Sequence, residues 1–378
     1  MLELGSMGLM EKKPIHWPTT LYIIGYHLFL LIALPLYFLH NLPSAALVWT
    51  TVALVFASGF GITVSYHRLW SHTTYKVTNP LLQIVFLFFG SLATQGSALQ
   101  WCHDHRLHHA FVDTDKDPYS IKKGFWYAHL LWMFRKSNVV DPKIVSDLLK
   151  NKLLVFQHRY YVWCMLASNA IVALTVGWLI GDYWSAFLFA WWVRLFALHH
   201  TTWFINSLAH SWGAQHYSEE HSAVDNYFLC LFTYGEGYHN YHHTFAYDYR
   251  NGIRWYHFDP TKWIIWTLSK FGLAKDLKKT SDFRIVRQLV SEHKERLLTA
   301  LKTSIHDALA PKVTEMADRV LERLSTLQQL SEAPTTLRNQ LQSAKREWKA
   351  QWKEWKRLLR ELRRLPLKLA DEHPHGIA

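Results

Sequence analysis

The sequence predicts an all-α membrane protein. Its expected parts are four transmembrane helices in two hairpins, a cytoplasmic helical cap that carries a site for two metal ions, and a C-terminal amphipathic helical extension. Three observations predict this fold. Uncharged apolar runs of spanning length recur in the first 204 residues, histidines cluster after them, and charged helix-forming sequence begins at residue 281. We therefore divide the chain into a membrane domain, 1–280, and a basic amphipathic helical region, 281–378.

The first hairpin is formed by the spans 21–38 and 44–64, which contain no charged residue. Each is long enough to cross a hydrocarbon core of about 30 Å. Basic residues precede the first span and follow the second, so the positive-inside tendency predicts that both ends face the cytoplasm.

The uncharged run 80–99 would also qualify as a span by hydropathy. If it crossed the bilayer, the histidines before it and those after it would lie on opposite sides, and one metal centre could not use both. We expect this run to enter the core and return, or to lie buried against other helices.

The second hairpin is formed by the spans 160–180 and 183–204, joined at Gly181 and Asp182. Arg194 lies inside the second of these spans. A charge there needs a partner or a functional use, unless its side chain extends to the membrane surface. Four spans place every histidine cluster on the cytoplasmic side.

Two histidine triplets have the spacing i, i+3 and i+4, which puts three imidazoles on one face of a helix. They are His105, His108 and His109, and His239, His242 and His243. Neutral imidazoles on one face suit a transition metal. The alternative is a polar helix face whose histidines contact water.

Two further clusters supply three more histidines. His67 and His72 are five residues apart, about 140° on a straight helix, so both could bind one ion only if the helix ends or unwinds between them. His210 follows Asn206 by four residues. Nine histidines exceed the needs of one ion, so we predict two ions with four or five nitrogen ligands each.

Composition excludes some functions. The net charge of +12 lies beside apolar segments and in the tail, which favours anionic lipid over nucleic acid as the contact. Three scattered cysteines indicate no disulfide framework, and the first fourteen residues show no cleavable signal peptide. The acidic run 113–117 lacks the glycine and glutamate of a calcium loop.

The tail carries no visible chemistry. Residues 283–330 predict one amphipathic helix or two, with Pro311 as the candidate break, and 335–365 predicts another. Its apolar stripe has heptad-like spacing and consists of Trp348, Trp352, Trp355, Leu359 and Leu362. The stripe could lie on the membrane surface, pack on the preceding helices or pair with another chain, and we favour the membrane surface.

The four clusters together resemble those of the membrane acyl-CoA desaturases of the stearoyl-CoA Δ9 type. The matching stretches are His-Arg-Leu-Trp-Ser-His at 67–72, His-Arg-Leu-His-His at 105–109, Asn-Ser-Leu-Ala-His at 206–210 and His-Asn-Tyr-His-His at 239–243. The resemblance covers about 17–270 in order, spacing and topology. It does not cover the tail.

The resemblance implies a non-haem centre of two iron ions, with O2 as co-substrate. Its implied ligands are His67, His72, His105, His108, His109, His210, His239, His242 and His243, with Asn206 acting through a bound water. His103 lies outside this set. Nearby polar side chains could orient the imidazoles or be ordinary helix caps: Asp104, Asp225, Asn226 and Glu236.

The resemblance also implies where the substrate lies. Gln95, Trp101, Thr202 and Trp203 match positions that shape a bent acyl tunnel, although both tryptophans could be ordinary core aromatics. Lys122 and Lys123 match a basic pair near the coenzyme A head group, although any exposed lysine pair looks the same. The implied substrate is a saturated fatty acyl-CoA of 16 or 18 carbons, which would become cis-monounsaturated.

An unactivated methylene can be oxidised only by a strong oxidant, here iron with O2. Electrons must come from an external donor such as ferredoxin, rubredoxin, cytochrome b5 or a flavoprotein reductase. A di-iron lipid hydroxylase, a phospholipid-acyl desaturase and a haem- or metal-binding membrane protein are the alternatives. We expect a multi-pass protein of the bacterial inner membrane with its catalytic side in the cytoplasm. The sequence does not give the double-bond position, electron donor or oligomeric state.

Overall fold

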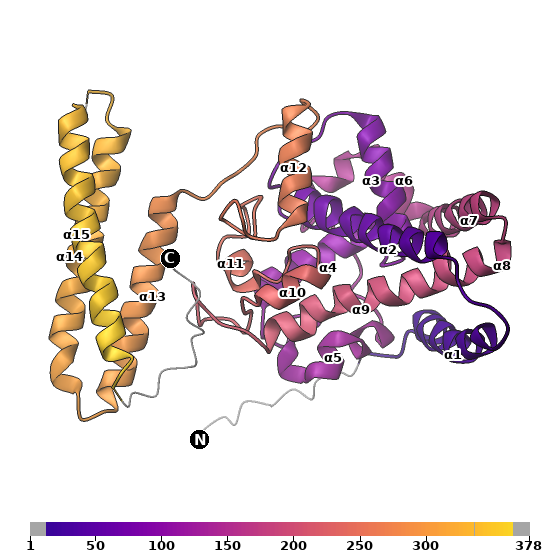
Figure 1. The fold of residues 1–378 in the computed structure, drawn as a ribbon, viewed down its shortest axis with the longest axis horizontal. Coiled ribbons are helices and arrows are strands. Elements are labelled where there is room, and N and C mark those ends of the chain that lie inside the picture. The colour runs from indigo at the N-terminus through magenta and orange to yellow at the C-terminus, as the bar shows by residue number, and fades with distance from the viewer. Residues whose placement is uncertain (1–12, 336, 366–378) are drawn as a thin grey trace, which may run out of the picture.

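The computed structural model describes residues 13–335 and 337–365, and it is helical throughout, with isolated β-bridges but no strand in those ranges (Figure 1). The α-helices are α1 (Trp17–His40), α2 (Ala45–Phe60), α3 (Pro80–Leu92), α4 (Ala98–Phe111), α5 (Phe125–His129), α6 (Lys152–Arg159), α7 (Tyr161–Ile180), α8 (Tyr183–Ala186), α9 (Arg194–Ser207), α10 (Tyr227–Phe232), α11 (His239–Thr244), α12 (Pro260–Lys270), α13 (Asp282–Lys302), α14 (Ala310–Glu332) and α15 (Arg338–Leu362). Two π-helices, η1 (Gly61–Ser71) and η5 (Phe187–Val193), continue α2 and α8, and the 3₁₀ turns are η2 (Ile121–Lys123), η3 (Leu131–Phe134), η4 (Leu148–Lys150), η6 (Leu208–His210) and η7 (Asp307–Leu309).

Three helices among the described residues are long and apolar enough to cross a membrane: Trp17–His40, Ala45–Ser71 and Tyr161–Ile180. Their outer side chains are exposed, as lipid contact requires, with Leu31 70% and Trp49 71% accessible. The predicted fourth span is helical without a break from Tyr183 to Ser207, through α8, η5 and α9. It packs against α2 and α7 but is not among those three helices.

The run 80–99 does not form one long helix. Asn79 caps α3, and Pro80 occupies its first turn, where a missing N–H costs nothing. α3 is a short apolar helix of 13 residues that packs against η1, α2 and α7. It ends in a turn in which Gly96 has a φ of +95°. The second half of α3 is buried against other helices, as one of the two expectations had it, whereas Leu81, Ile84 and Val85 in its first half are exposed.

Arg194 is completely buried, and neutral acceptors surround its guanidinium. Nε donates to the Ala190 carbonyl at 2.9 Å, and Nη1 donates to the Leu92 carbonyl at 2.9 Å and to Ser58 Oγ at 3.3 Å. Nη2 donates to the Asn169 side chain. The side chain therefore does not reach the membrane surface but connects α9 with α2, α3 and α7.

The tail forms a three-helix bundle of α13, α14 and α15, and Pro311 lies in the first turn of α14. Within the apolar stripe of α15, Trp355 is fully buried and Leu362 is 2% accessible, in a core shared with Val290 and Val320. The favoured prediction of membrane attachment is therefore wrong for this stripe, because the preceding helices cover it.

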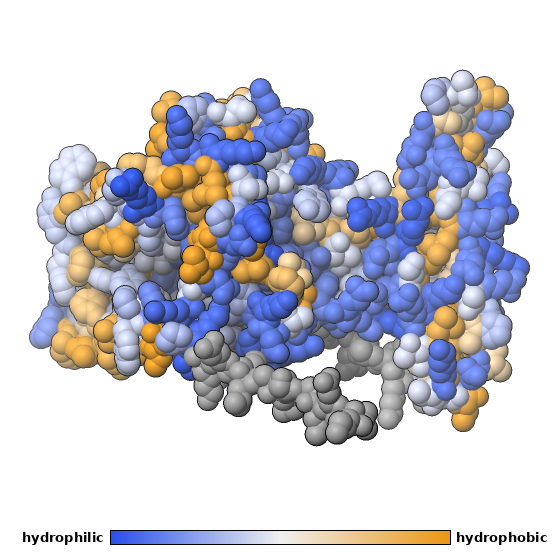
Figure 2. All heavy atoms as spheres, turned by 180° about the vertical axis from the view of Figure 1, so that it is seen from behind, coloured by the Kyte–Doolittle hydropathy of each residue, from blue (hydrophilic) through white to orange (hydrophobic). Residues whose placement is uncertain are grey.

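The bundle lies at the end of the molecule opposite α7 and α8 (Figure 1). The surface in Figure 2 agrees with this arrangement: apolar side chains form patches over the part that contains the spans, whereas the bundle is mostly hydrophilic. The clustered histidines lie between them, on η1 and the residue that follows it, α4, η6 and α11.

Candidate metal centre

The nine predicted histidines meet in two groups, and within each group the candidate ligand atoms lie within 4.8 Å of one another. The first group contains His67, His72, His105, His109 and His242, and the second contains His108, His210, His239 and His243. Each triplet is divided between the groups. α4 and α11 therefore each contribute to both, which places the two groups side by side.

His67 and His72 reach one group because α2 widens into the π-helix η1. The backbone N–H of His72 bonds the carbonyl of His67 at 3.1 Å, an i to i+5 bond that brings residues five apart to one side. Of the two conditions stated from the sequence, an ending or an unwinding of the helix, the structure shows a local unwinding into a π-helix. Arg106 fixes the end of η1 by donating to the carbonyls of Trp70 at 2.7 Å and Ser71 at 3.0 Å.

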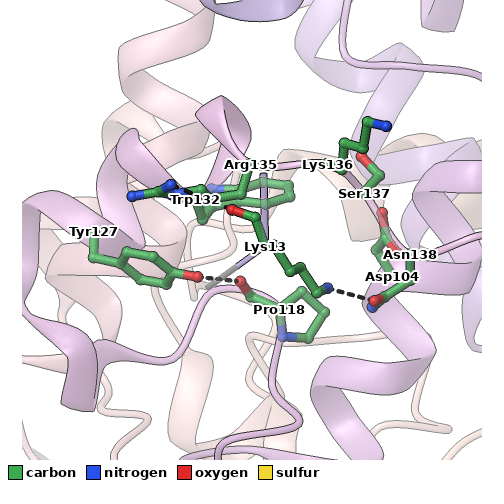
Figure 3. Close-up of a pocket in the computed structure, with 9 residues that line it drawn as sticks. All are labelled: Lys13, Asp104, Pro118, Tyr127, Trp132, Arg135, Lys136, Ser137 and Asn138. Carbon is green, nitrogen blue, oxygen red and sulfur yellow. Dashed lines mark hydrogen bonds between the residues drawn. The ribbon is translucent and has the colours of Figure 1, made fainter. Parts of the chain in front are cut away.

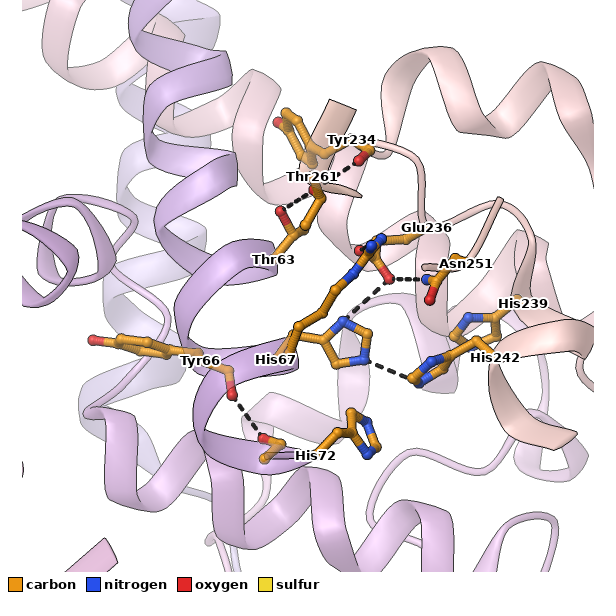
Figure 4. A network of polar contacts seen from close by, with 12 residues as sticks. Thr63, Tyr66, His67, His72, Tyr234, Glu236, His239, His242, Asn251 and Thr261 are labelled. Atoms are coloured by element: carbon orange, nitrogen blue, oxygen red, sulfur yellow. Dashed lines mark hydrogen bonds and ion pairs between the residues drawn. The ribbon is translucent and has the colours of Figure 1, made fainter. Parts of the chain in front are cut away.

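The imidazoles approach one another through their Nε2 atoms (Figure 4). In the first group, Nε2 of His67 lies 3.0 Å from that of His242, and Nε2 of His72 lies 2.8 Å from that of His105. In the second group, Nε2 of His239 lies 3.1 Å from that of His210. Converging ring nitrogens of this kind form a donor set suited to a transition metal ion.

Carboxylates fix the tautomers of two of these rings. Nδ1 of His67 lies 3.1 Å from Glu236 Oε2, and Nδ1 of His108 lies 2.9 Å from Asp117 Oδ1. A carboxylate only accepts, so Nδ1 carries the hydrogen and Nε2 keeps its lone pair. His108 Nε2 is buried without a hydrogen-bond partner in the described chain. An orphaned buried lone pair inside a histidine group fits a bound cation.

His210 is oriented through a hydroxyl. Ser222 Oγ lies 2.6 Å from Asp113 Oδ1 and 2.8 Å from His210 Nδ1. Because the carboxylate only accepts, the hydroxyl donates to Asp113 and accepts from His210 Nδ1, which again leaves Nε2 for a ligand. In the first group, His105 Nδ1 lies 3.2 Å from the Tyr119 hydroxyl.

Burial and the neighbouring imidazoles keep the histidines neutral, the form that binds metal. They lower the pKa of His239 to about 3 and hold six others well below their usual range: His72, His105, His109, His210, His242 and His243.

Glu236 belongs to a buried ion network (Figure 4). Arg68 donates to Glu236 at 2.8 Å and to Asp259 at 2.9 Å, and Asn251 donates to Glu236 at 2.6 Å. Burial alone would raise the pKa of Glu236, but Arg68 and His67 outweigh it and hold the value at about 2. The carboxylate beside His67 is therefore ionised at neutral pH.

The other predicted orienting residues lie elsewhere. Asp104 contacts His103 at 3.0 Å, Asp225 accepts the Tyr241 backbone N–H at 3.1 Å, and Asn226 caps α10. In the described chain, none of these three side chains bonds one of the nine imidazoles.

Sequence reasoning missed four orienting residues, Asp113, Asp117, Tyr119 and Ser222. Asp113 and Asp117 belong to the acidic run 113–117, which the sequence analysis compared only with a calcium loop. Its position directly after the histidines of α4 was the available signal.

Three of the residues matched to the substrate tunnel lie close to the histidines or to each other. Trp101 stacks on His105 with ring centroids 4.8 Å apart, and Gln95 donates to Thr202 Oγ1 at 2.8 Å. Trp203 is buried, and its ring stacks against that of His199.

The remaining predicted site residues, Asn206, Lys122 and Lys123, make few side-chain hydrogen bonds within the described ranges. Asn206 is half-buried, one turn of helix before His210, and its side chain makes no hydrogen bond within the described ranges. Lys122 and Lys123 are exposed on η2, where Lys123 donates to the Asp115 carbonyl at 3.2 Å.

A basic pocket opens beside α4 (Figure 3). Lys13, Arg135 and Lys136 contribute its cations, and the Lys13 ammonium bonds the Asn138 side chain. Asp104, the residue directly before His105 in the sequence, also lines it. A negatively charged group bound here would lie close to the element that carries three of the nine histidines.

Comparison with known sequences matches residues 17–275 to the family model described as fatty acid desaturase. The chain is 40% identical over 289 residues to a protein of Schizosaccharomyces pombe named probable acyl-CoA desaturase, covering 74% of this chain and 60% of that protein. It is 37% identical over 250 residues to stearoyl-CoA desaturase of Sus scrofa, covering 64% and 69%. It is 30% identical over 275 residues to sn-1 stearoyl-lipid 9-desaturase of Anabaena variabilis, covering 72% and 97%. The chain thus spans less than two thirds of the length of the S. pombe relative.

Proposed function

Because the chain belongs to the fatty acid desaturase family, we propose that it introduces a cis double bond, of the Δ9 type, into a saturated fatty acyl-CoA. The reaction takes place at a centre of two iron ions, with O2 as co-substrate. One observation carries the proposal: nine buried or half-buried imidazoles bring their ring nitrogens together in two adjacent groups.

The nine histidines would hold the ions, five at one and four at the other, and Asn206 would contribute through a bound water. Iron with O2 supplies the oxidant needed to remove hydrogen from an unactivated methylene. Glu236, Asp117 and Ser222 fix the tautomers of His67, His108 and His210, so that the Nε2 lone pair of each would be available to an ion.

The protein contributes to selectivity by positioning the acyl chain relative to the metal centre. Trp101 lies against His105, and the Gln95–Thr202 hydrogen bond joins the turn after α3 to α9. We propose that these residues and Trp203 line the path of the acyl chain. A shift of about 1.3 Å, one methylene, changes which carbons face the centre, so geometry determines the double-bond position.

The phosphates of coenzyme A need cations, and we propose that the basic pocket of Lys13, Arg135 and Lys136 binds them. Lys122 and Lys123 remain proposed as outer basic contacts. The relatives named acyl-CoA and stearoyl-CoA desaturase support acyl-CoA as the substrate. The Anabaena relative, named a stearoyl-lipid desaturase, supports the phospholipid alternative.

The reaction converts O2 and the two abstracted hydrogens to water and consumes two electrons and two protons. We propose that an external carrier, such as a ferredoxin, rubredoxin, cytochrome b5 or flavoprotein reductase, supplies the electrons. We also propose four membrane crossings, with 183–207 as the fourth and the histidines on the cytoplasmic side. The bacterial inner membrane remains a prediction from sequence.

The decisive experiment uses protein purified in mild detergent. Iron is measured per chain, an optical spectrum is recorded, and turnover with stearoyl-CoA, O2 and a reducing system is followed by product analysis. About two irons and an unsaturated product support the proposal. A hydroxylated product would indicate the hydroxylase alternative, turnover only of phospholipid would replace the substrate, and a Soret band would indicate haem.

A further inference from the structure

We propose that α13, the first helix of the C-terminal bundle, is a positioning element for the second histidine group, and that it acts through the loop 213–224. This proposal rests on the proposed metal-binding function. It gives the tail a role that its sequence did not suggest, because the residues concerned lie on the face of α13 opposite the bundle.

Polar contacts hold the loop against α13. Gln288 Nε2 donates to the Tyr217 carbonyl at 2.7 Å, and Glu292 Oε1 accepts the Glu219 backbone N–H at 3.0 Å. Arg296 Nε lies 2.9 Å from the Glu219 carboxylate and 3.1 Å from that of Glu292. Its side chain is 10% accessible, so solvent screens these interactions less than those of an exposed pair.

An apolar contact supports the same connection. Ile285 and Leu289 of α13 are buried in one cluster with Tyr217 of the loop and with Tyr241 and Phe245 at α11. Burial of these side chains removes apolar surface from water on both partners. Helix, loop and α11 therefore pack as one unit.

The loop in turn is attached to α11 through Asn240, which is fully buried between His239 and His242 in the sequence. Asn240 Oδ1 accepts the Tyr217 N–H at 2.7 Å, and Nδ2 donates to the carbonyls of Ser218 at 2.7 Å and Ala223 at 2.9 Å. Both ends of the amide are engaged, so displacement of the loop would rotate or translate the start of α11.

The loop also contacts the second group directly. Ser222 orients His210, as described above, and the ring of His221 lies 5.2 Å from that of His243. In the first group only His242 lies on α11, and its other members belong to η1, its C-terminal cap and α4. Loosening the loop should therefore affect the second ion more than the first.

The test compares two cations on α13 of the full-length protein. Arg296→Ala removes the contact with the loop. Lys294→Ala is the matched control, because Lys294 pairs with Asp318 of α14 at 2.7 Å, inside the bundle. Chelator-driven release of iron is followed by iron content and by Mössbauer spectra of ⁵⁷Fe-loaded protein, and hydrogen exchange is measured in 213–224.

We expect Arg296→Ala to release one of the two ions about tenfold faster or more. This is comparable with the loss of metal affinity that follows mutation of residues that orient metal ligands. Exchange in the loop should rise, Arg296→Lys should restore part of the retention, and Lys294→Ala should match wild type. If Arg296→Ala does not fold, Gln288→Ala replaces it.

The proposal would be overturned if Arg296→Ala and Lys294→Ala released iron at equal rates, or if Arg296→Ala accelerated the release of both ions equally. If the wild type binds no metal, the proposed function fails independently. Faster loop exchange in Arg296→Ala alone would then still support the connection through α13, and unchanged exchange would contradict it.

Discussion

At the scale of single residues, the partner of each Nδ1 atom determines what the opposite nitrogen can do. Asp117 accepts from His108, and the Asp113–Ser222 pair accepts from His210, so both Nε2 lone pairs face the second group. Spacing along a helix identified the histidines as a set. It could not show which partners fix them, because Asp113 and Ser222 are distant in sequence and meet only in the fold.

The substitutions His108→Gln and His103→Gln compare a member of the second histidine group with a nearby histidine that belongs to neither group. Both histidines are buried on α4, but His103 contacts Asp104 and belongs to neither group. We expect His108→Gln to retain about one iron per chain, because it removes one of four ligands at the second ion, and His103→Gln to retain two. Elemental analysis after gel filtration measures both. Two irons in His108→Gln would remove this residue from the ligand set.

Glu236→Gln tests the ionic support of the first group. The substitution keeps an acceptor for His67 but removes the charge next to Arg68, which retains Asp259. Removing one partner of a buried ion pair costs about 3 kcal/mol or more. We therefore expect a lower unfolding temperature at pH 7 in detergent, and no such change for the exposed control Glu220→Gln.

The pH dependence of this difference follows from the pKa of Glu236, about 2 in the folded protein and about 4.3 when unfolded. A depressed pKa means that the stabilisation is complete above pH 4.3 and is lost as the pH falls toward 2. The difference in unfolding temperature between wild type and Glu236→Gln should decrease below about pH 4. A constant difference would show that the carboxylate charge is not its source.

At the scale of elements, the π-helix η1 is the feature on which the first group depends. The five-residue spacing of His67 and His72 required a helix that ends or unwinds if both were to bind one ion, and the structure has a π-helix there. The division of each triplet between two groups was not predictable from spacing, since it depends on how α4 and α11 face each other. The tail shows the same limit of sequence reasoning. The apolar stripe of α15 was compatible with the membrane surface, the preceding helices or another chain, and only the packing in the structure identified α13 and α14 as its partners.

Close approach of α3 holds η1 in place, and Gly61→Ala should disturb it. A Cβ on Gly61 would lie 2.5 Å from the backbone carbonyl carbon of Phe89, which cannot move without moving α3. We expect a lower unfolding temperature and weaker iron retention at the first group. Gly25→Ala in α1 meets nothing within 4 Å and should be neutral or slightly stabilising. Equal behaviour of the two variants would contradict this account of the packing.

At the scale of the whole molecule, the place where the histidines meet supports the proposed four crossings. α7 begins beside the turn that follows α3, since Gly96 bonds Tyr161, and it ends at Gly181, far from the histidine groups (Figure 1). His210 nevertheless lies 3.1 Å from His239. The helix 183–207 must therefore return along α7, and its 25 residues extend roughly 37 Å, enough to cross the hydrocarbon core.

Cysteine labelling in sealed vesicles tests this topology. Cys102 and Cys230 are buried, so a Cys164→Ser background leaves little native reactivity. Val139 and Ile305 are both 92% accessible, and Leu42 in the α1–α2 connection is 84% accessible. Four crossings predict that Val139→Cys and Ile305→Cys react from the same side and Leu42→Cys from the other. If 183–207 did not cross, Ile305→Cys would instead react together with Leu42→Cys, while Val139→Cys would be unaffected. Ile305→Cys alone therefore decides between three and four spans. A three-span result would contradict the arrangement in which Nε2 of His210 lies 3.1 Å from that of His239.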